Sequence, residues 1–266
     1  MQKVISKDGT SIAFDQTGSG QPVILVAGAF SFRKYPGSLE LAALLSRDFT
    51  VINYDRRGRG DSGDTKPYSV AREIEDLEAL INHVGGSTYM WGLSSGAVLA
   101  LKAAASGLNV KKLAVYDPPF GVDNTAILPP SDFVKHLTEL IARDQRGDAV
   151  RYFMTKGMGA PGFVMVMMRL MPGVWPRLTA VANTLPYDAM MLDGHITGQP
   201  LKAQDWAGVT MPTLVTAGSK STTSLRHAAQ QLAEILPNAQ HRLLEGLSHT
   251  NIDMKVIAPV LKEFFS

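Results

Sequence analysis

The chain has 266 residues, of which 45% are hydrophobic and 19% charged, with a formal net charge of +2 and no cysteine. This composition excludes a disordered or membrane-embedded chain, and the small charge argues against nucleic acid or an anionic membrane as a partner. Without cysteine there is no disulfide, thiol nucleophile or cysteine metal site. The N-terminal residues lack the apolar stretch of a signal peptide, so we expect a cytoplasmic protein.

Apolar periodicity predicts strands that alternate with helices over the first part of the chain. The first two strands would form a hairpin at Asp8-Gly9, and the later ones are apolar runs typical of buried parallel strands. The strands are predicted at 2–5, 11–16, 23–26 and 50–54, and the helices at 39–45 and 70–84. Such alternation indicates a mostly parallel sheet with helices on both faces.

The most informative stretch is Met90–Ala97, which contains Gly-x-Ser-x-Gly with Ser94 at its centre. A strand-like run precedes it and a helix-like run follows at 97–105, so Ser94 is predicted on a sharp strand-to-helix turn. The flanking glycines would keep a Cβ out of this crowded turn. Ser94 is then a candidate nucleophile, and the N–H of Ser95 lies where a helix N-terminus favours negative charge. The alternative is an ordinary glycine-rich turn.

The alternation continues with a strand at 113–116 and breaks at Asp117-Pro118-Pro119. From there to about residue 205 the pattern predicts helices and no strand. The sheet pattern then returns over 212–218, with a strand at 214–217, and is followed by a helix at 224–236, a strand at 241–244 and a helix at 256–265. A connection of this length argues for an inserted lid. We therefore predict a core formed by 1–117 and 206–266 and a helical cap formed by 118–205.

The predicted cap carries eight Lys or Arg and eight Asp or Glu, so it has no net charge to attract an ionic substrate. It also holds eight of the twelve methionines. These methionines could line an adaptable apolar pocket together with Phe153, Phe163, Trp175 and Trp206. The alternative is that these side chains form the core of the cap itself.

His249 is the one histidine of six in a short loop after the last predicted strand, at the sheet edge where α/β active sites lie. A base there could take the proton of the Ser94 hydroxyl as it attacks. The other histidines are interpreted as surface or structural residues: His83, His136, His195, His227 and His241. No two histidines have the spacing of metal ligands with a carboxylate, so we expect no metal.

Four pieces of the chain, in this order, resemble the α/β-hydrolase family: Val26–Ala29, Tyr54–Gly63, the turn at Ser94, and Gly246–His249. The resemblance extends over essentially the whole chain. It implies the α/β-hydrolase fold, an eight-stranded and mostly parallel sheet with helices on both faces and an inserted helical lid. It also implies a serine, acid and histidine in that chain order, with Ser94 as the nucleophile and His249 as the general base.

The family usually places its acid after the strand at 214–217, but here the loop Gly218–Ser224 has no carboxylate and the next one is Glu234. Asp117, at the end of the preceding strand, is the natural substitute, because some family members carry the acid there. It would accept the other N–H of the histidine, hold its tautomer and stabilise the imidazolium. The alternative is a turn residue before two prolines. Short stretches around Ser94 and Asp117 are also similar to the fungal zearalenone lactonases, which have an acid in this place.

The usual His-Gly pair after the third strand is Ala27-Gly28 in this chain. An oxyanion hole uses backbone donors, so we expect one from the N–H groups of Ala29 and Ser95. Two aimed donors are worth several kcal/mol to a tetrahedral transition state. A shift of the register by one residue would bring in Phe30 or Ser31 instead of Ala29.

The loop after the fourth strand contains Asp55, Asp61 and three arginines, Arg56, Arg57 and Arg59. We interpret both aspartates as structural, bonded to loop backbone and paired with these arginines. A phosphate-binding loop would need a different glycine spacing and a lysine.

A serine nucleophile favours acyl chemistry, whereas epoxide hydrolysis and dehalogenation need a carboxylate. The sequence therefore predicts a hydrolase of small-to-medium apolar carboxylic esters or lactones, without metal or organic cofactor, present as a monomer or homodimer. A carbon–carbon bond or thioester hydrolase with the same triad is the alternative among enzymes. A ligand-binding protein with little turnover is the alternative from another class, since a fold does not determine a function.

Overall fold

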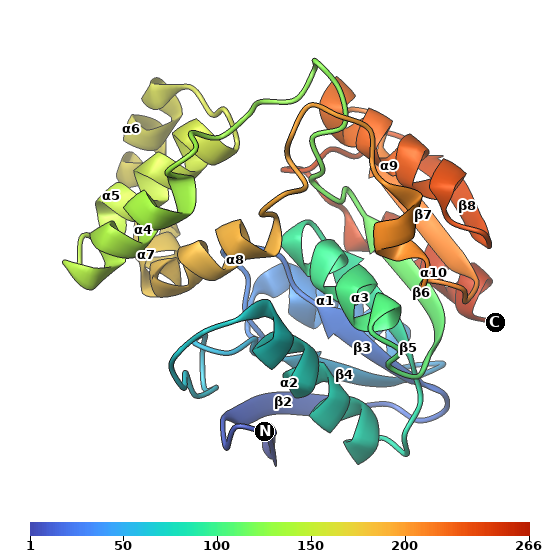
Figure 1. The fold of residues 1–266 in the computed structure, drawn as a ribbon. Helices are drawn as coiled ribbons and strands as arrows, with labels where there is room; N and C mark the ends of the chain where they lie inside the picture. The colour runs from blue at the N-terminus through green and yellow to red at the C-terminus, as the bar shows by residue number, and fades with distance from the viewer.

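One sheet of eight strands runs through the computed structural model, which describes residues 1–266 (Figure 1). The strands are β1 (Gln2–Ile5), β2 (Ser11–Thr17), β3 (Pro22–Val26), β4 (Thr50–Tyr54), β5 (Thr88–Leu93), β6 (Val110–Tyr116), β7 (Thr213–Gly218) and β8 (Ala239–Leu244). Their order across the sheet is β1-β2-β4-β3-β5-β6-β7-β8. Strand β2 pairs antiparallel with β1 and β4, and all other pairs are parallel. The predicted eight-stranded, mostly parallel sheet is confirmed.

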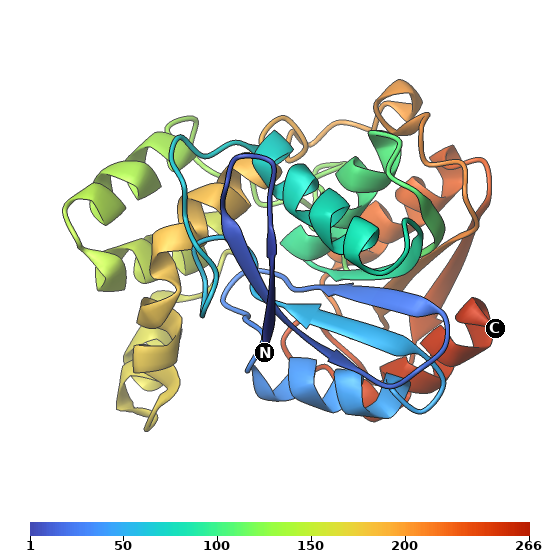
Figure 2. The ribbon, with the colours of Figure 1, turned by 90° about the horizontal axis from the view of Figure 1, so that it is seen from below.

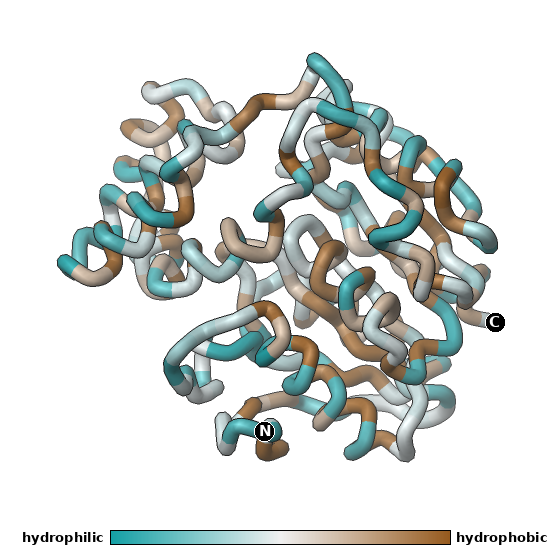
Figure 3. Tube along the Cα trace, viewed as in Figure 1, coloured by the Kyte–Doolittle hydropathy of each residue, from teal (hydrophilic) through white to brown (hydrophobic).

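Helices cover both faces of this sheet, as predicted (Figure 2). Helices α1 (Pro36–Leu45) and α10 (Met254–Phe265) lie on one face, and α2 (Val70–His83), α3 (Ser95–Ala105) and α9 (Thr223–Ile235) on the other. Along β3, Ile24 and Val26 pack with the second set while Val23 and Leu25 pack with the first. Alternate residues of a strand point to opposite faces, so a strand buried on both sides is apolar throughout. Figure 3 shows the hydrophobic residues concentrated along the sheet and the helix sides facing it.

The chain between β6 and β7 forms a separate group of helices (Figure 1). These are α4 (Phe133–Ala142), α5 (Arg146–Tyr152), α6 (Gly162–Leu170), α7 (Val174–Ala180) and α8 (Leu185–Met191). Residues 118–205 contain no strand, only one isolated bridge between Gly121 and Ile196. The group has its own apolar core, which includes Phe133, Leu137 and Val150. Of its helices, α8 packs directly on α2 and α3.

The elements differ from the predicted ones mainly at their first residues. Helix α1 begins at Pro36, three residues before the predicted start, because proline fits the first turn of a helix, where its missing N–H costs nothing. Strand β6 begins at Val110 and β8 at Ala239, since polar residues such as Lys112 continue the ladder without an apolar signal. None of the helices combines the length and apolar character that crossing a membrane requires.

Candidate active site

Ser94 lies at the turn from β5 into α3 with φ +56° and ψ −127°, a conformation that side chains seldom adopt. The glycines on either side are required by close backbone contacts. A Cβ on Gly92 would lie 2.6 Å from Ala97 Cα, and one on Gly96 would lie 2.6 Å from the carbonyl oxygen of Ala27. The predicted strand–turn–helix setting of the motif is confirmed, and Ser94 is held by a turn that only these glycines allow.

Three residues predicted from distant parts of the sequence meet at the carboxyl ends of the strands. The Oγ of Ser94 lies 3.2 Å from Nε2 of His249, and Nδ1 of that ring lies 3.2 Å from Oδ2 of Asp117. Asp117 is fully buried, whereas His249 is 17% exposed. Asp117 follows β6 directly and His249 lies in the loop between β8 and α10. The arrangement can pass a proton from the serine hydroxyl to an imidazole that a carboxylate orients.

The end of β7 and the loop that follows it donate hydrogen bonds to Asp117, and this loop has no acid of its own. The N–H of Gly218 donates to Oδ1 at 3.2 Å, and the hydroxyl of Ser221 donates to Oδ2 at 2.6 Å. Ser221 is itself buried. A buried carboxyl group without hydrogen-bond partners would be costly, and these two bonds satisfy both of its oxygens. The sequence analysis missed Ser221, for which the only signal was a run of hydroxyl residues in the loop where an acid was expected.

Two backbone N–H groups beside Ser94 are free to bind negative charge. Ala29 follows β3 and its N–H donates no hydrogen bond. The N–H of Ser95 is the first of α3 and has no acceptor within the helix. Gly28 makes the close approach of these two segments possible, because a Cβ there would lie 2.9 Å from Cβ of Ser94. Both Ala29 and Ser95 line the same cavity as the serine.

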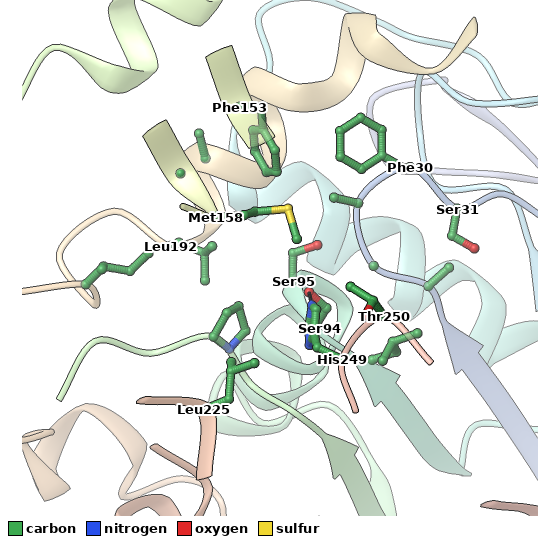
Figure 4. Close-up of a pocket in the computed structure, with 18 of the residues that line it drawn as sticks. Phe30, Ser31, Ser94, Ser95, Phe153, Met158, Leu192, Leu225, His249 and Thr250 are labelled. Atoms are coloured by element: carbon green, nitrogen blue, oxygen red, sulfur yellow. Dashed lines mark hydrogen bonds between the residues drawn. The ribbon is translucent and has the colours of Figure 1, made fainter. Parts of the chain in front are cut away.

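That cavity has a volume of about 1550 Å³ and opens to solvent between the sheet edge and the helical segment. Ser94, Ser95 and His249 lie together at its floor, and Phe30, Phe153, Met158, Leu192 and Leu225 surround them (Figure 4). Two further methionines of the helical segment, Met168 and Met171, line it. The walls near the serine are mainly apolar.

The aromatic residues proposed for the pocket divide between three environments. Phe153 lines the cavity and packs edge-on against Phe30, with ring centroids 5.5 Å apart. Trp175 packs on the core of the helical segment, and Trp206 packs against Phe120 in the main core. Phe163 is 65% exposed and lies outside the cavity. Only Phe153 of the four therefore lines the pocket, because Trp175 and Trp206 pack in two different cores and Phe163 faces solvent.

The pairing predicted for Asp55 and Asp61 is wrong. Both carboxylates bond Arg33, which the sequence analysis did not consider, and Asp61 also contacts Lys34. Asp55 further accepts the N–H of Arg33 at 2.6 Å and that of Asp61 at 2.9 Å, so its structural role is confirmed with a different partner. The loop turns its arginines away from these aspartates and into the protein.

Each of the three arginines of this loop is buried against carboxylates from other elements. Arg57 forms a bidentate pair with Asp76 of α2, at 2.8 and 2.7 Å. Arg56 pairs with Glu73 at 2.7 Å, and both Arg56 and Arg59 reach a carboxylate of α8. This fully buried acid, Asp188, had no distinguishing sequence signal, since its two arginine partners lie more than a hundred residues away in the chain.

None of the other histidines lines the cavity. His227 bonds Asp123 at 2.5 Å, and His195 contacts Lys102 at 3.0 Å. Burial lowers the pKa of His195, and the nearby Lys102 ammonium lowers it further. The structure contains no group of three histidine, cysteine or acidic side chains arranged to hold a metal ion.

Comparison with known proteins agrees with this architecture. A sequence model of the alpha/beta hydrolase family matches residues 23–254. The crystal structure of an alpha/beta hydrolase from Sphaerobacter thermophilus is 49% identical, with a TM-score of 0.91 over 100% of both chains. An enol-lactonase from Burkholderia xenovorans is 18% identical with a TM-score of 0.73, over 99% of each chain. A thermophilic esterase from Thermogutta terrifontis is 21% identical with a TM-score of 0.70, over 99% of this chain and 97% of its own. The chain belongs to the alpha/beta hydrolase family.

Proposed function

We propose that this hydrolase cleaves small-to-medium apolar carboxylic esters or lactones through an acyl-enzyme. The observation that carries the proposal is the unbroken chain of Ser94, His249 and Asp117 at the floor of an apolar cavity. An apolar pocket with a few convergent polar groups suits a neutral substrate whose reacting carbonyl is its main polar feature. The names of two structural neighbours, an enol-lactonase and an esterase, agree with this class of reaction.

In the first half of the reaction, Ser94 Oγ attacks the substrate carbonyl carbon while His249 Nε2 takes the hydroxyl proton. The carbonyl oxygen becomes an oxyanion, which the N–H groups of Ala29 and Ser95 would bind. Asp117 accepts the Nδ1–H of His249 and stabilises the imidazolium. When the tetrahedral intermediate collapses, the leaving alkoxide takes the proton from His249 and the acyl group stays on Ser94.

In the second half, water enters the place of the alcohol and gives a proton to His249 as its oxygen attacks the acyl carbon. The oxyanion forms at the same two N–H groups. Collapse breaks the bond to Ser94, whose oxygen recovers the proton from His249, and the acid leaves. With a lactone, the leaving alkoxide is part of the acyl group, so one hydroxy acid is released.

We further propose that residues 118–205 act as a cap over a core of residues 1–117 and 206–266. The helical segment has its own apolar core and contributes Phe153, Met158 and Leu192 to the cavity wall. Its equal numbers of acidic and basic residues suit an uncharged substrate. In this assignment the core carries the chemistry and the cap selects the substrate.

The test is hydrolysis of p-nitrophenyl esters from acetate to laurate, and of matched lactones, by the wild type, Ser94→Ala and Asp117→Asn. We expect kcat/KM to fall about a hundredfold or more in both variants. Ser94→Ala removes the nucleophile, and Asp117→Asn removes the carboxylate that holds the tautomer of His249. Glu234→Gln is the matched control, because Glu234 is the next carboxylate after β7 and bonds only Gln230 on the surface of α9. Full activity of Asp117→Asn would remove this residue from the triad.

Labelling by a fluorophosphonate separates the proposal from a ligand-binding role. A reactive serine is labelled at Ser94 within minutes and the Ser94→Ala variant is not. A wild type that neither turns over these substrates nor takes the label would establish a binding protein on this fold. If a carbon–carbon or thioester substrate is cleaved faster than any ester, the enzyme is a hydrolase of that substrate class with the same triad.

A further inference from the structure

A single buried carboxylate connects the helical segment to both sides of the proposed oxyanion hole. Asp188 of α8 is fully buried. Its Oδ1 accepts hydrogen bonds from the hydroxyl of Ser95 and from Nη1 of Arg56, both at 2.7 Å. Its Oδ2 accepts one from Nη2 of Arg59 at 2.6 Å. One wall of the hole, the first residue of α3, is therefore bonded directly to Asp188.

The two arginines carry the connection to the other wall, the loop that contains Ala29. Nη1 of Arg59 donates to the carbonyl oxygens of Gly28 at 2.6 Å and Ser31 at 3.0 Å. Nη1 of Arg56 lies 3.2 Å from the carbonyl oxygen of Ala27. Guanidinium groups thus hold the carbonyls on both sides of Ala29. The free N–H of Ala29 keeps its direction because the peptide groups around it are bonded.

We propose that Asp188 is a positioning residue that holds the N–H groups of Ala29 and Ser95 at the separation an oxyanion requires. This inference rests on the proposed function, in which those two groups bind the oxyanion. Asp188 touches neither substrate nor reacting atoms, and it acts through Ser95 on one side and Arg59 on the other. Oxyanion donors act only when they are held in advance at the position where charge develops.

Charge balance makes Asp188 the critical member of the group. Arg56 has a second carboxylate, since its Nε and Nη2 bond Glu73, both at 2.7 Å. Arg59 has no other acid and bonds otherwise only Thr184 and the two loop carbonyls. Without Asp188 the buried guanidinium of Arg59 is uncompensated, and leaving a buried charge unpaired is strongly unfavourable. The loop carbonyls then lose the partner whose position Asp188 determines.

The decisive variant is Asp188→Asn, which keeps the size of the side chain but places an amide N–H group among donors. We expect kcat to fall about ten- to a hundredfold, a part of what losing a whole oxyanion donor costs, while KM changes less than about threefold. A trifluoromethyl ketone matched to the substrate, which forms an oxyanion on Ser94, should bind more weakly by the same factor. The corresponding unreactive methyl ether should bind as it does to the wild type.

Asp76→Asn is the matched control. Asp76 is equally buried and holds Arg57 by two bonds, but this pair contacts no part of the loop at Ala29. The control should lower the melting temperature and leave kcat and the ketone affinity within about twofold of the wild type. Equal losses of kcat in both variants would overturn the proposal, because they would reflect loss of stability in general.

Ser95→Ala keeps the test valid if Asp188→Asn does not fold. This variant retains the backbone N–H and both arginine bonds, and removes only the hydroxyl that Asp188 holds. We expect about a tenfold lower kcat, again with weaker ketone binding and an unchanged affinity for the ether. If the wild type hydrolyses esters but kcat is unchanged in these variants, the role of Asp188 is overturned and the proposed function stands. A wild type that neither hydrolyses esters nor takes the fluorophosphonate label overturns the proposed function as well.

Discussion

The hydroxyl of Ser221 donates a 2.6 Å hydrogen bond to Oδ2 of Asp117, the same oxygen that lies 3.2 Å from Nδ1 of His249. Ser221 belongs to the loop after β7, where the resemblance led us to look for an acid. The acid of the proposed triad, Asp117, follows β6 instead, and it is held by the N–H of Gly218 at the end of β7 and by the hydroxyl of Ser221 in the loop beyond it. Two neighbouring strand ends therefore both contribute to the position of Asp117 beside His249.

This contact predicts a measurable role for Ser221. Ser221→Ala removes one of the donors to a buried carboxylate, and a hydrogen bond to a charged group contributes about 1.5–3 kcal/mol. We expect a loss of stability of this size and a several-fold lower kcat/KM on an ester, since Asp117 is less firmly oriented toward the histidine. Urea denaturation and initial rates give the two quantities. Ser221→Thr, which keeps the hydroxyl, should recover most of both, and failure to do so would show that the loss arose from packing.

The backbone contacts of the nucleophile turn predict that Gly96 is irreplaceable. A Cβ in Gly96→Ala would overlap the carbonyls of Val26 and Ala27, so strand and helix would have to separate. We expect a destabilisation of about 1–3 kcal/mol, as for other overpacked sites, together with loss of most activity because Ser94 moves. Thermal unfolding and ester hydrolysis measure both effects.

Gly162→Ala is the control for that substitution. Gly162 is the first residue of α6 and has no atom within 4 Å of the position of an added Cβ. Alanine there should leave activity unchanged and stability equal or slightly higher, because it reduces the freedom of the unfolded chain. Equal effects of the two substitutions would contradict the packing argument.

The cavity geometry predicts that Met158 limits the length of the acyl chain. Its side chain points toward Ser94 and Ser95 from the helical segment (Figure 4). Met158→Trp should lower kcat/KM for the longest p-nitrophenyl ester by about tenfold relative to the acetate, since a pocket contact of this kind is worth about 1–3 kcal/mol. Met167→Trp is the control, because Met167 is 56% exposed and does not line the cavity. An unchanged chain-length profile in the first variant would place the acyl group elsewhere.

The buried Asp188 predicts how stability depends on pH. Burial alone would raise the pKa of this carboxyl, but the charges of Arg59 and Arg56 outweigh burial and hold its pKa below the ordinary value. Because the folded pKa is depressed, the contribution of Asp188 is complete above about pH 4 and is lost as the pH falls through the folded pKa. The difference in free energy of unfolding between the wild type and Asp188→Asn should be constant near neutral pH and shrink below about pH 4. Urea denaturation across this range tests it, and a constant difference throughout would contradict it.

Much of the architecture could be predicted because the relevant signals are local. An apolar run such as Val23–Val26 reports burial on both faces, and the glycines around Ser94 report a crowded turn, which the structure confirms. The predicted starts of helices and strands were less accurate, as for α1 at Pro36 and β6 at Val110. A helix or a ladder extends beyond its apolar residues when its hydrogen bonds are made.

The partners of buried charges could not be predicted. Asp55 bonds Arg33 instead of its neighbours in the loop, and Arg59 bonds an acid of α8 far along the chain. We had predicted pairs between the aspartates and arginines of the loop because these residues are close together in the sequence. The path of the backbone turns those side chains to opposite sides, and no periodic pattern records that direction.

The sequence by itself determined the family, the order of strands and helices, and the identities of Ser94 and His249 as candidates, because strained turns and buried strands restrict which residues can occur there. Only the tertiary structure decided that Asp117 reaches His249, that Ser221 bonds Asp117, and that Asp188 bonds Ser95 directly and the loop at Gly28 through Arg59. The physical reason is that a hydrogen bond between buried polar groups depends on distance and direction in space. Residues that are adjacent in the fold but separated by a hundred positions in the chain leave no shared pattern in the sequence.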